Sequence, residues 1–407
     1  MSFADDSRCD YWTRGECRSC DLAIPDYRHH LTRVSEATRS ALPRIDESAW
    51  LPPQASRQWG FRNKAKLAIG GRAGAVTLGI HRRHATRSEA TRTPVRHEVW
   101  QGVDLSHCPL YDEAMRQVIA HTAQWLNHMR ITPYDIGTRE GETKYVLITE
   151  SPQRRFMVRV VVRSEVVIDT IRHHVDALIT GAPHPIDVIS VNIQPEPTAI
   201  IEGDRDVTLV GDMLAMPLAL DDTTINLWLP PGAFFQTNTD VARALYTQAK
   251  RWCAALHPTT AIDLFCGVGG FALAVSEHCA TVSGVEVSRP AIAAAQRAHR
   301  SISTPHQADM SFRAGDAIAL ADETVESIGG DLDLLIVNPP RRGITSLTEW
   351  VERTHPRALI YSSCNPVSLA ADLNRLPSYR VRRARVFDMF PWTSHAEVMV
   401  LATRVTA

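Results

Sequence analysis

Two residues in the last part of the chain have side chains suited to covalent catalysis. Cys364 follows an apolar run that begins at Ala358, within the sequence Tyr-Ser-Ser-Cys-Asn-Pro. Glu397 stands among apolar residues in a run that ends at Leu401. A thiolate can add to an electron-poor carbon and a carboxylate can remove a proton, so the pair is suited to forming and resolving a covalent intermediate. Each residue alone is equally well explained as a buried thiol or a strand-edge acid.

A glycine-rich turn earlier in the chain is suited to binding a nucleotide-like cofactor. Residues 261–264 form a short apolar run, and Gly267 and Gly269 crowd the turn that precedes a helix of small residues. Such a turn places backbone N–H groups and a helix N-terminus beside the ligand. Glu286 ends the next run 19 positions after Gly267 (286 − 267), where an acid can accept hydrogen bonds from ribose hydroxyls. Asp316, after the third run, is placed to meet an adenine amino group.

An adenosyl pocket beside a thiol and a carboxylate predicts S-adenosylmethionine as cofactor and a pyrimidine carbon as methyl acceptor. C5 of uracil is a poor nucleophile, but addition of the Cys364 thiolate to C6 gives an enolate whose C5 can attack the methyl group. A base must then remove the proton left on C5 before the thiolate is expelled, and Glu397 fits this role. The two residues together, on neighbouring strand ends, favour the catalytic interpretation over the structural one.

Two other functions remain open on these residues. Asn338-Pro-Pro follows the fourth apolar run, and the same tripeptide type occurs where methyl groups go to exocyclic amines. The cysteine downstream argues for carbon methylation instead. A protein of another class, a non-catalytic iron–sulfur RNA-binding factor that retains an adenosyl pocket, would contain the same motifs.

A second set of cysteines is suited to metal binding. Cys9, Cys17 and Cys20 crowd a short polar segment that is poor material for a core, and Cys108 is the best candidate for a fourth ligand. Four thiolates suit zinc or an iron–sulfur cluster. Because only one short Cys-x-x-Cys pair is present, the spacing favours the cluster. The cysteines of the later α/β region are interpreted as ordinary core thiols: Cys253, Cys266 and Cys279.

Residues 57–100 form a basic region in a chain whose formal net charge is −1. Arg62 and Lys64 lie on an alternating segment, which predicts a strand with basic side chains on one face, and Trp59 and Phe61 are interleaved with them. Such a surface could neutralise phosphates while aromatic rings stack on unpaired bases. A solvated charged face explains the region equally well on the residues alone.

The totals indicate a globular chain. At 407 residues it can form two or more domains. No apolar run approaches the ~20 residues that span a bilayer, and the first residues lack an apolar signal core, so we expect a cytoplasmic protein with no membrane contact.

The chemistry-bearing residues require an α/β fold that brings strand ends together. From residue 261 onward, strand-like and helix-like segments alternate as in a doubly wound, Rossmann-like domain, whose ligands lie at the carboxyl edge of the sheet. We expect three regions: an iron–sulfur and basic region over 1–110, a central α+β domain over 111–230, and a methyltransferase domain over 231–407. A helix is expected at Thr239–Leu256, capped by Asn238 or Thr239.

Five motifs as a set resemble the RNA (uracil-5-)-methyltransferase family: Phe234-Phe-Gln-Thr-Asn238, Asp263-Leu-Phe-Cys-Gly-Val-Gly-Gly270, Val337-Asn-Pro-Pro-Arg341, Tyr361-Ser-Ser-Cys-Asn365 and His395-Ala-Glu397. The N-terminal cysteines and the domain order are similar to its iron–sulfur 23S rRNA branch, and the likeness covers nearly the whole chain. Since the cysteines begin at residue 9, we expect the short subgroup that lacks the TRAM domain. The tRNA-modifying branch, the nearest alternative, lacks these cysteines.

The resemblance implies a role for each motif residue. Gln236, Phe265, Glu286 and Asn338 would contact S-adenosylmethionine, with Cys364 as nucleophile and Glu397 as proton acceptor. Cys9, Cys17, Cys20 and Cys108 would hold a [4Fe–4S] cluster, while Arg62 and Lys64 would face 23S rRNA. The subgroup further implies a site of the uracil-747 type, and we expect a monomer. Asn338 departs from branches that carry Asp, and the Arg/Thr-rich stretch 85–96 has no assigned role.

Overall fold

The computed structural model describes residues 9–21, 26–80, 102–302 and 308–405, and its chain divides into two compact units. Unit 1 comprises Met1–Ser19 and Trp59–Leu214, and unit 2 comprises Cys20–Gln58 and Ala215–Ala407. The Arg/Thr-rich stretch 85–96, to which the sequence assigns no role, lies outside the described residues. Within the described residues, no helix has both the length and the apolar character needed to cross a membrane.

Unit 1 is built on one mixed seven-stranded sheet with the order β3-β2-β1-β4-β5-β6-β7, in which only the β5–β6 pair is parallel. Val118, Ile119 and Trp125 of helix α3 are buried in the same hydrophobic core as the apolar residues of this sheet. The elements are α1 (Asp10–Thr13), β1 (Lys64–Arg72), β2 (Ala75–Ile80), β3 (Val103–Asp104), α3 (Glu113–Met129), β4 (Thr143–Glu150), β5 (Phe156–Val162), η2 (Glu165–Val167), α4 (Ile168–His173), α5 (Val175–Thr180), β6 (Ile186–Ile193) and β7 (Arg205–Val210).

This sheet crosses the boundary expected at residue 110. β1 hydrogen-bonds to β4 over five register positions, from Lys64 opposite Thr149 to Ala68 opposite Tyr145. Sequence alternation identifies a strand but not its partner, so the two regions looked separate. The basic alternation itself is present, because Lys64 and Lys66 alternate with buried Ala65 in β1.

Unit 2 contains the doubly wound sheet expected for the last part of the chain, with the order β12-β11-β10-β13-β14-β16-β15. The elements are α2 (Tyr27–Ser40), η1 (Glu47–Ala49), β8 (Leu214–Leu220), β9 (Thr223–Leu229), α6 (Thr239–Leu256), β10 (Thr260–Leu264), α7 (Gly270–Val275), η3 (Ser276–His278), β11 (Thr281–Glu286), α8 (Arg289–Arg300), β12 (Asp309–Ala314), α9 (Ala321–Ser327), β13 (Leu334–Val337), η4 (Thr345–Leu347), α10 (Thr348–Thr354), β14 (Ala358–Ser363), α11 (Pro366–Asn374), β15 (Tyr379–Phe387) and β16 (Glu397–Arg404).

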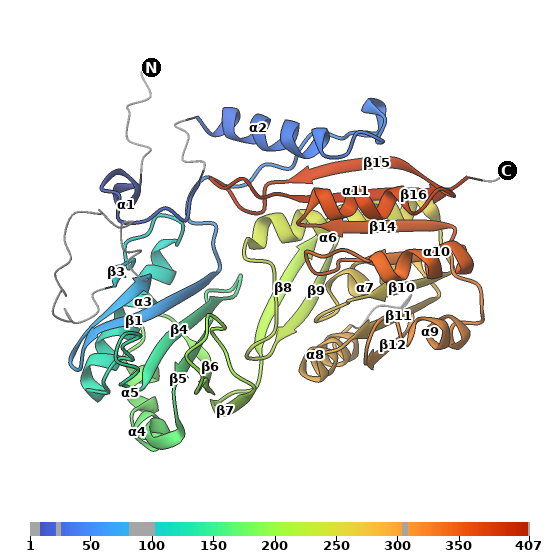
Figure 1. The fold of residues 1–407 in the computed structure, drawn as a ribbon. Coiled ribbons are helices and arrows are strands. Elements are labelled where there is room, and N and C mark those ends of the chain that lie inside the picture. Colours follow the sequence, from blue (N-terminus) through green and yellow to red (C-terminus); the bar gives the residue numbers. More distant parts are fainter. Residues whose placement is uncertain (1–8, 22–25, 81–101, 303–307, 406–407) are drawn as a thin grey trace. The chain divides into compact units, whose positions relative to one another are not determined.

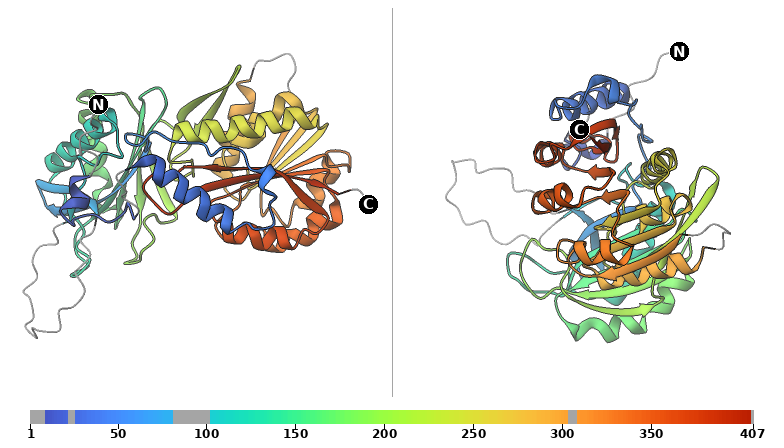
Figure 2. Two further views of the ribbon diagram at one scale, coloured as in Figure 1. Left: turned by 90° about the horizontal axis from the view of Figure 1, so that it is seen from above. Right: turned by 90° about the vertical axis from the view of Figure 1, so that its right-hand side faces the viewer.

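The parallel strands of unit 2 are buried on both faces, which is why their sequences read as continuous apolar runs. Figure 2 shows α6 on one face of the sheet, with α10 and α11 on the other. Strand order reverses at β10, which lies between β11 and β13, so a crevice opens beyond its carboxyl end. α6 begins where the sequence predicts, since the Asn238 side chain accepts a hydrogen bond from Val241 N at 3.3 Å.

Residues from the first part of the chain complete unit 2. Leu51 N donates to Ala384 O at 2.8 Å, so the segment before residue 58 runs along β15, the edge strand. Val34 of α2 packs with Val386 and Ala396, and α2 follows β15 in Figure 1 and Figure 2. The expectation that residues 1–110 belong together therefore misses a long-range contact that local patterns do not encode.

Candidate functional site

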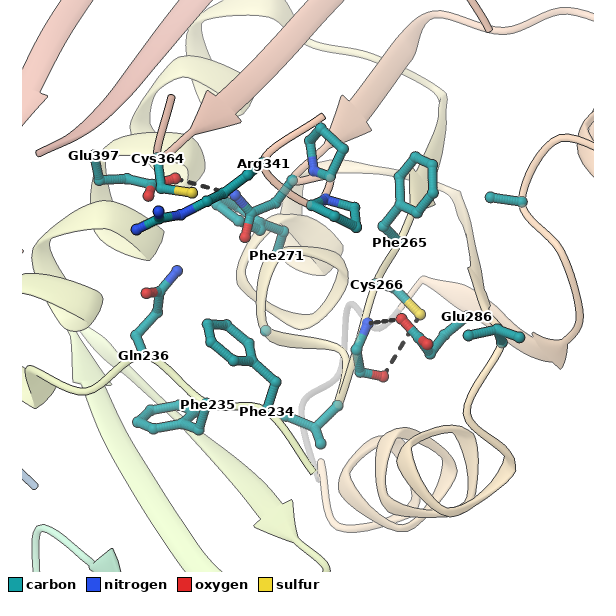
Figure 3. Close-up of a pocket in the computed structure, with 18 of the residues that line it drawn as sticks. Phe234, Phe235, Gln236, Phe265, Cys266, Phe271, Glu286, Arg341, Cys364 and Glu397 are labelled. Atoms are coloured by element: carbon teal, nitrogen blue, oxygen red, sulfur yellow. Dashed lines mark hydrogen bonds between the residues drawn. The ribbon is translucent and has the colours of Figure 1, made fainter. Parts of the chain in front are cut away.

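A cavity of about 700 Å³ opens at the carboxyl edge of the unit 2 sheet. Its walls come from the ends of β10, β11, β13, β14 and β16 and from the segment before α6 (Figure 3). Eight of the predicted site residues line this cavity: Gln236, Phe265, Gly267, Glu286, Asp316, Asn338, Cys364 and Glu397. The parallel strand ends explain this convergence, because residues far apart in the chain meet at one edge.

The turn after β10 is held in a backbone conformation that favours glycine. Gly267 and Gly269 have φ angles of +54° and +87°, and Phe265 also has a positive φ, +68°. A Cβ on Gly269 would approach Cβ of Ala295 at 3.1 Å, so this residue supports the turn from behind the cavity. Phe265 tolerates the left-handed region only because the surrounding turn fixes it, and its ring lines the cavity.

Glu286 is hydrogen-bonded to the turn at the end of β11. Its Oε2 accepts from Gly267 N at 3.3 Å and its Oε1 from Ser288 N at 3.0 Å. Val287 is exposed and offers an apolar surface at the same wall. Asp316 lies beyond it, and its Oδ1 accepts from the backbone N–H of Ile318 at 2.9 Å. Glu286 and Asp316 thus place two carboxylates on the same apolar wall of the cavity.

Asp263 is the first residue of the glycine motif, and its sequence context indicates no role for it. In the structure its side chain supports the same turn. Its side chain is fully buried at the end of β10, and Oδ2 accepts from Ala272 N at 3.0 Å. Burial raises the pKa of this carboxyl to about 8, the Ala272 hydrogen bond opposes the rise, and the charge of Glu286 adds to it. The residue fixes the start of α7, and the apolar run that contains it masks this role in the sequence.

Glu397, at the first position of β16, is buried and hydrogen-bonded on one carboxyl oxygen. Asn338 Nδ2 donates to its Oε1 at 3.1 Å, and the Ser362 hydroxyl donates to the same oxygen. Burial raises the pKa of Glu397 to about 7, against the lowering effect of these two hydrogen bonds. A carboxyl group with this pKa accepts and releases a proton near neutral pH, as a general base requires.

Cys364 follows β14 and faces the same cavity as Glu397 (Figure 3). Burial raises the pKa of its thiol and the Glu397 charge adds to the rise, whereas the Arg341 guanidinium lowers it by charge and by a hydrogen bond. Asn365 Nδ2 donates to Arg341 O at 3.0 Å, which connects the turn after β13 to the one after β14. The sequence motif alone does not indicate this role of Arg341. Its position as a cation directly after the Pro-Pro pair is the one feature of the sequence that could have pointed to it.

Aromatic side chains and an amide form the wall before α6. Phe234 is 69% exposed although it lines the cavity, so its ring lies at the entrance. Gln236 is buried and its amide group is directed toward the side occupied by Arg341 and Cys364 (Figure 3). An exposed ring at an entrance can stack on an unpaired base.

The N-terminal cysteines divide between the units. Cys9, Cys17 and Cys108 pack against the unit 1 core, while Cys20 is the first residue of unit 2. Burial raises the pKa of Cys108 to about 11, and the charges of Cys9 and Cys17 contribute to the rise. Over the described ranges, no three Cys, His, Asp or Glu side chains are grouped so that they could hold a metal ion. The expected ligand set is thus not assembled by these side-chain positions.

Arg62 and Lys64, the predicted RNA-contact residues, lie in unit 1. Arg62 Nε donates to Lys64 O at 3.0 Å, so this side chain follows the strand backbone. Burial lowers the pKa of Lys64 to about 8, and the charge of Lys66 contributes in the same direction. Lys66 is the exposed member of the pair, which makes it the more accessible cation of β1.

The fold and cavity define a class: a doubly wound α/β enzyme whose crevice at the carboxyl edge of the sheet is lined by a half-buried thiol and a buried carboxylate. The chain belongs to the tRNA (uracil-5-)-methyltransferase family, whose model matches residues 201–405.

Curated relatives support the family over nearly the full length. The 23S rRNA (uracil(747)-C(5))-methyltransferase RlmC of Vibrio vulnificus strain CMCP6 is 39% identical over 97% of this chain and 99% of its own. The protein of the same name from Halothiobacillus neapolitanus is 39% identical over 98% and 99%. Among solved structures, the Pyrococcus abyssi tRNA (uracil-54, C5)-methyltransferase in complex with S-adenosyl-L-homocysteine has a TM-score of 0.71 at 22% identity, covering 94% of this chain and 85% of that one. That structure shares the fold.

Proposed function

We propose that this protein methylates C5 of a uridine in 23S rRNA, with S-adenosylmethionine as the methyl donor. The observation that carries the proposal is that Cys364 and Glu397 line one cavity together with Glu286 and the glycine turn. A thiol and a base beside an adenosyl crevice are the groups that carbon methylation of uracil requires. The names of the full-length relatives support both the reaction and the rRNA substrate.

The cofactor-binding part of the proposal rests on groups at the ends of β10 and β11. Glu286, fixed by Gly267 N, accepts hydrogen bonds from the ribose hydroxyls. Asp316 meets the adenine amino group, while Val287 and Phe265 enclose the ring. When bound, S-adenosylmethionine would supply an electrophilic methyl group.

The acceptor part of the proposal rests on the ends of β13, β14 and β16. The Cys364 sulfur adds to C6 of uracil, aided by Arg341, which favours the thiolate. Asn338 Nδ2 is engaged by Glu397 and by Ser362 O at 3.1 Å, so its carbonyl oxygen remains to orient the uracil. After methyl transfer to C5, Glu397 removes the C5 proton and the C6–sulfur bond breaks, which releases Cys364 as a thiolate and leaves the proton on Glu397.

The target, a uridine equivalent to position 747, is proposed from the names of the relatives. Arg62 and Lys64 are proposed to bind the RNA backbone, with Phe234 stacking on the extruded base. We place the protein in the cytoplasm with the ribosomal RNA and propose that it acts as a monomer, which light scattering of the free and RNA-bound protein tests.

The experiment that tests the function uses 23S rRNA from cells with and without the gene, digested and mapped for 5-methyluridine by mass spectrometry. Loss of one methyl group near position 747, restored by wild-type protein but not by Cys364→Ala, supports the proposal. A tRNA transcript serves as the competing substrate. Methylation of that transcript alone, or of an exocyclic amine by Cys364→Ala, contradicts it.

A [4Fe–4S] cluster held by Cys9, Cys17, Cys20 and Cys108 is proposed from the cysteine spacing and the family resemblance. The packing of three of these cysteines on one core supports a shared cluster. The side-chain positions do not support it, because no three possible ligands among the described residues are grouped to hold a metal ion. No step of the reaction uses the cluster, since methyl transfer moves no net electrons. Iron and sulfide content after anaerobic purification tests it, with Cys20→Ser losing both and Cys279→Ser, outside the set, losing neither.

A further inference from the structure

Two cysteines outside the catalytic cavity face each other in unit 2. Cys253 lies in the last turns of α6, and Cys279 directly follows η3, two positions before β11 begins at Thr281. Their sulfur atoms are 3.7 Å apart. The sequence predicts both as independent core thiols, because 26 positions separate them and neither belongs to a metal-binding spacing.

An ion pair holds the same two elements in register. Lys250, one helical turn before Cys253, places Nζ 2.7 Å from Oε2 of Glu277, which lies two positions before Cys279. Lys250 is only 5% exposed and also donates to Asp222 Oδ1 at 2.9 Å. The buried Lys250 ammonium thus links α6 to the segment that precedes Cys279, next to the place where the two sulfur atoms approach each other.

The two thiols differ in access to solvent. Cys253 is fully buried, and its Sγ also lies 3.9 Å from Val275 O. Cys279 is half-buried, so a small oxidant in solution can reach its sulfur. An accessible thiol beside an enclosed second thiol is the arrangement in which one sulfur is oxidised and the other resolves it.

We propose that Cys253 and Cys279 form a reversible intramolecular disulfide when the protein meets a hydroperoxide such as hydrogen peroxide. The peroxide transfers one oxygen to the Cys279 sulfur and leaves as water, giving a sulfenic acid. The Cys253 sulfur attacks that sulfur, the S–O bond breaks, and the oxygen departs as a second water with the thiol proton. Two thiols lose two electrons and the peroxide gains them.

The hydrogen-bond contact with Cys279 and burial raise the pKa of Cys253, so its thiol has to give up its proton to the departing oxygen as it attacks. The bond would close a loop that contains β10 and the whole glycine turn, residues 253–279. The thiols lie near the amino ends of β10 and β11, at the opposite edge of the sheet from Glu286. The cross-link therefore restrains the unfolded chain without entering the cofactor crevice.

The test treats the full-length protein with equimolar hydrogen peroxide, blocks remaining thiols by alkylation, and maps unreduced peptides by mass spectrometry. We expect a linked peptide pair containing residues 253 and 279, two hydrogens lighter than the sum of the free peptides, which dithiothreitol separates. Recovery of Cys279 as sulfinic acid, or as free thiol while Cys364 is oxidised, overturns the proposal.

Cys279→Ser is the matched variant, since it keeps the size of a half-buried side chain and removes one sulfur. Peroxide should raise the melting temperature of the wild type by several degrees, as a loop-closing bond does, and leave that of Cys279→Ser unchanged. An equal change in both proteins contradicts the assignment. Cys253→Ala is the second variant: it should convert Cys279 from a cross-linked to a sulfinic residue, whereas persistent cross-linking of Cys279 would contradict the pairing.

Discussion

The amide nitrogen of Asn338 donates a hydrogen bond to Oε1 of Glu397 across 3.1 Å, joining the end of β13 to the start of β16. The hydrogen bond lowers the pKa of Glu397, which burial raises to about 7. A neutral amide at position 338 therefore keeps the proposed base ionised over more of the neutral range than a second carboxylate would.

Asn338→Asp is expected to slow methylation at neutral pH. A like charge beside a buried carboxyl raises its pKa, by an amount on the order of one unit, so Glu397 becomes a base only at higher pH. The ascending limb of the pH–rate profile should move to higher pH, with about a fivefold loss at pH 7. Single-turnover rates measured across a range of pH test this. If the ascending limb does not move, the contact between residues 338 and 397 does not control the pKa of the base.

Glu397→Gln is expected to separate bond formation from release. The glutamine cannot remove the C5 proton, so turnover should fall by roughly 10²–10⁴-fold while the protein–RNA adduct accumulates. Denaturing gels of variant and rRNA fragment should show the adduct, which Cys364→Ala must lack. Free methylated RNA at the wild-type rate would remove Glu397 from the mechanism.

Arg341→Ala is expected to reduce the reactivity of Cys364. The guanidinium lowers the thiol pKa, so its removal raises that pKa and leaves less thiolate at neutral pH. Alkylation of Cys364 by iodoacetamide should slow by about tenfold at pH 7 and recover at higher pH. Arg342→Ala, the adjacent residue, serves as the control, and an equal effect there would point to general loss of the turn.

Tyr27→Phe is expected to destabilise the protein. The Tyr27 hydroxyl donates to Asp388 Oδ2 at 2.7 Å and accepts from Ser56 N at 2.7 Å, and the Asp388 side chain is fully buried. Loss of a hydrogen bond to a buried carboxylate costs about 1–3 kcal/mol in unfolding free energy. Denaturant titration measures this, and Tyr27→Phe with wild-type stability would mean that water replaces the hydroxyl.

The sequence predicted those features of the structure that depend on residues close together in the chain. The Asn238 cap, the start of α6 and the residues at parallel strand ends follow from spacing and capping chemistry, which act within a few positions. Cys364 follows the carboxyl end of β14, and Glu397 begins the antiparallel strand β16 beside it, so the two residues meet at one cavity. Relationships between distant segments were out of reach: β1 pairs with β4, and Cys253 approaches Cys279, through packing that no local pattern records.

The roles of Ser362 and Asp263 could not be predicted from the sequence for a related reason. Ser362 lies near the end of an apolar strand, and Asp263 lies inside another, so both resemble core positions in the sequence. Their polar atoms acquire a function only when Glu397 and Ala272 N are brought beside them. The cysteine spacing near the N-terminus likewise indicated a ligand set, yet spacing fixes neither side-chain direction nor the unit to which each residue belongs.

β16 is hydrogen-bonded along both edges, to β14 on one side and β15 on the other. The carboxylate at its first residue is therefore anchored in the interior of a sheet, whereas the sulfur lies on a turn and Phe234 at an open rim. In the proposed reaction, entry of the substrate and release of the product would therefore depend on those turns, while the strands on both sides of β16 hold the carboxylate in place.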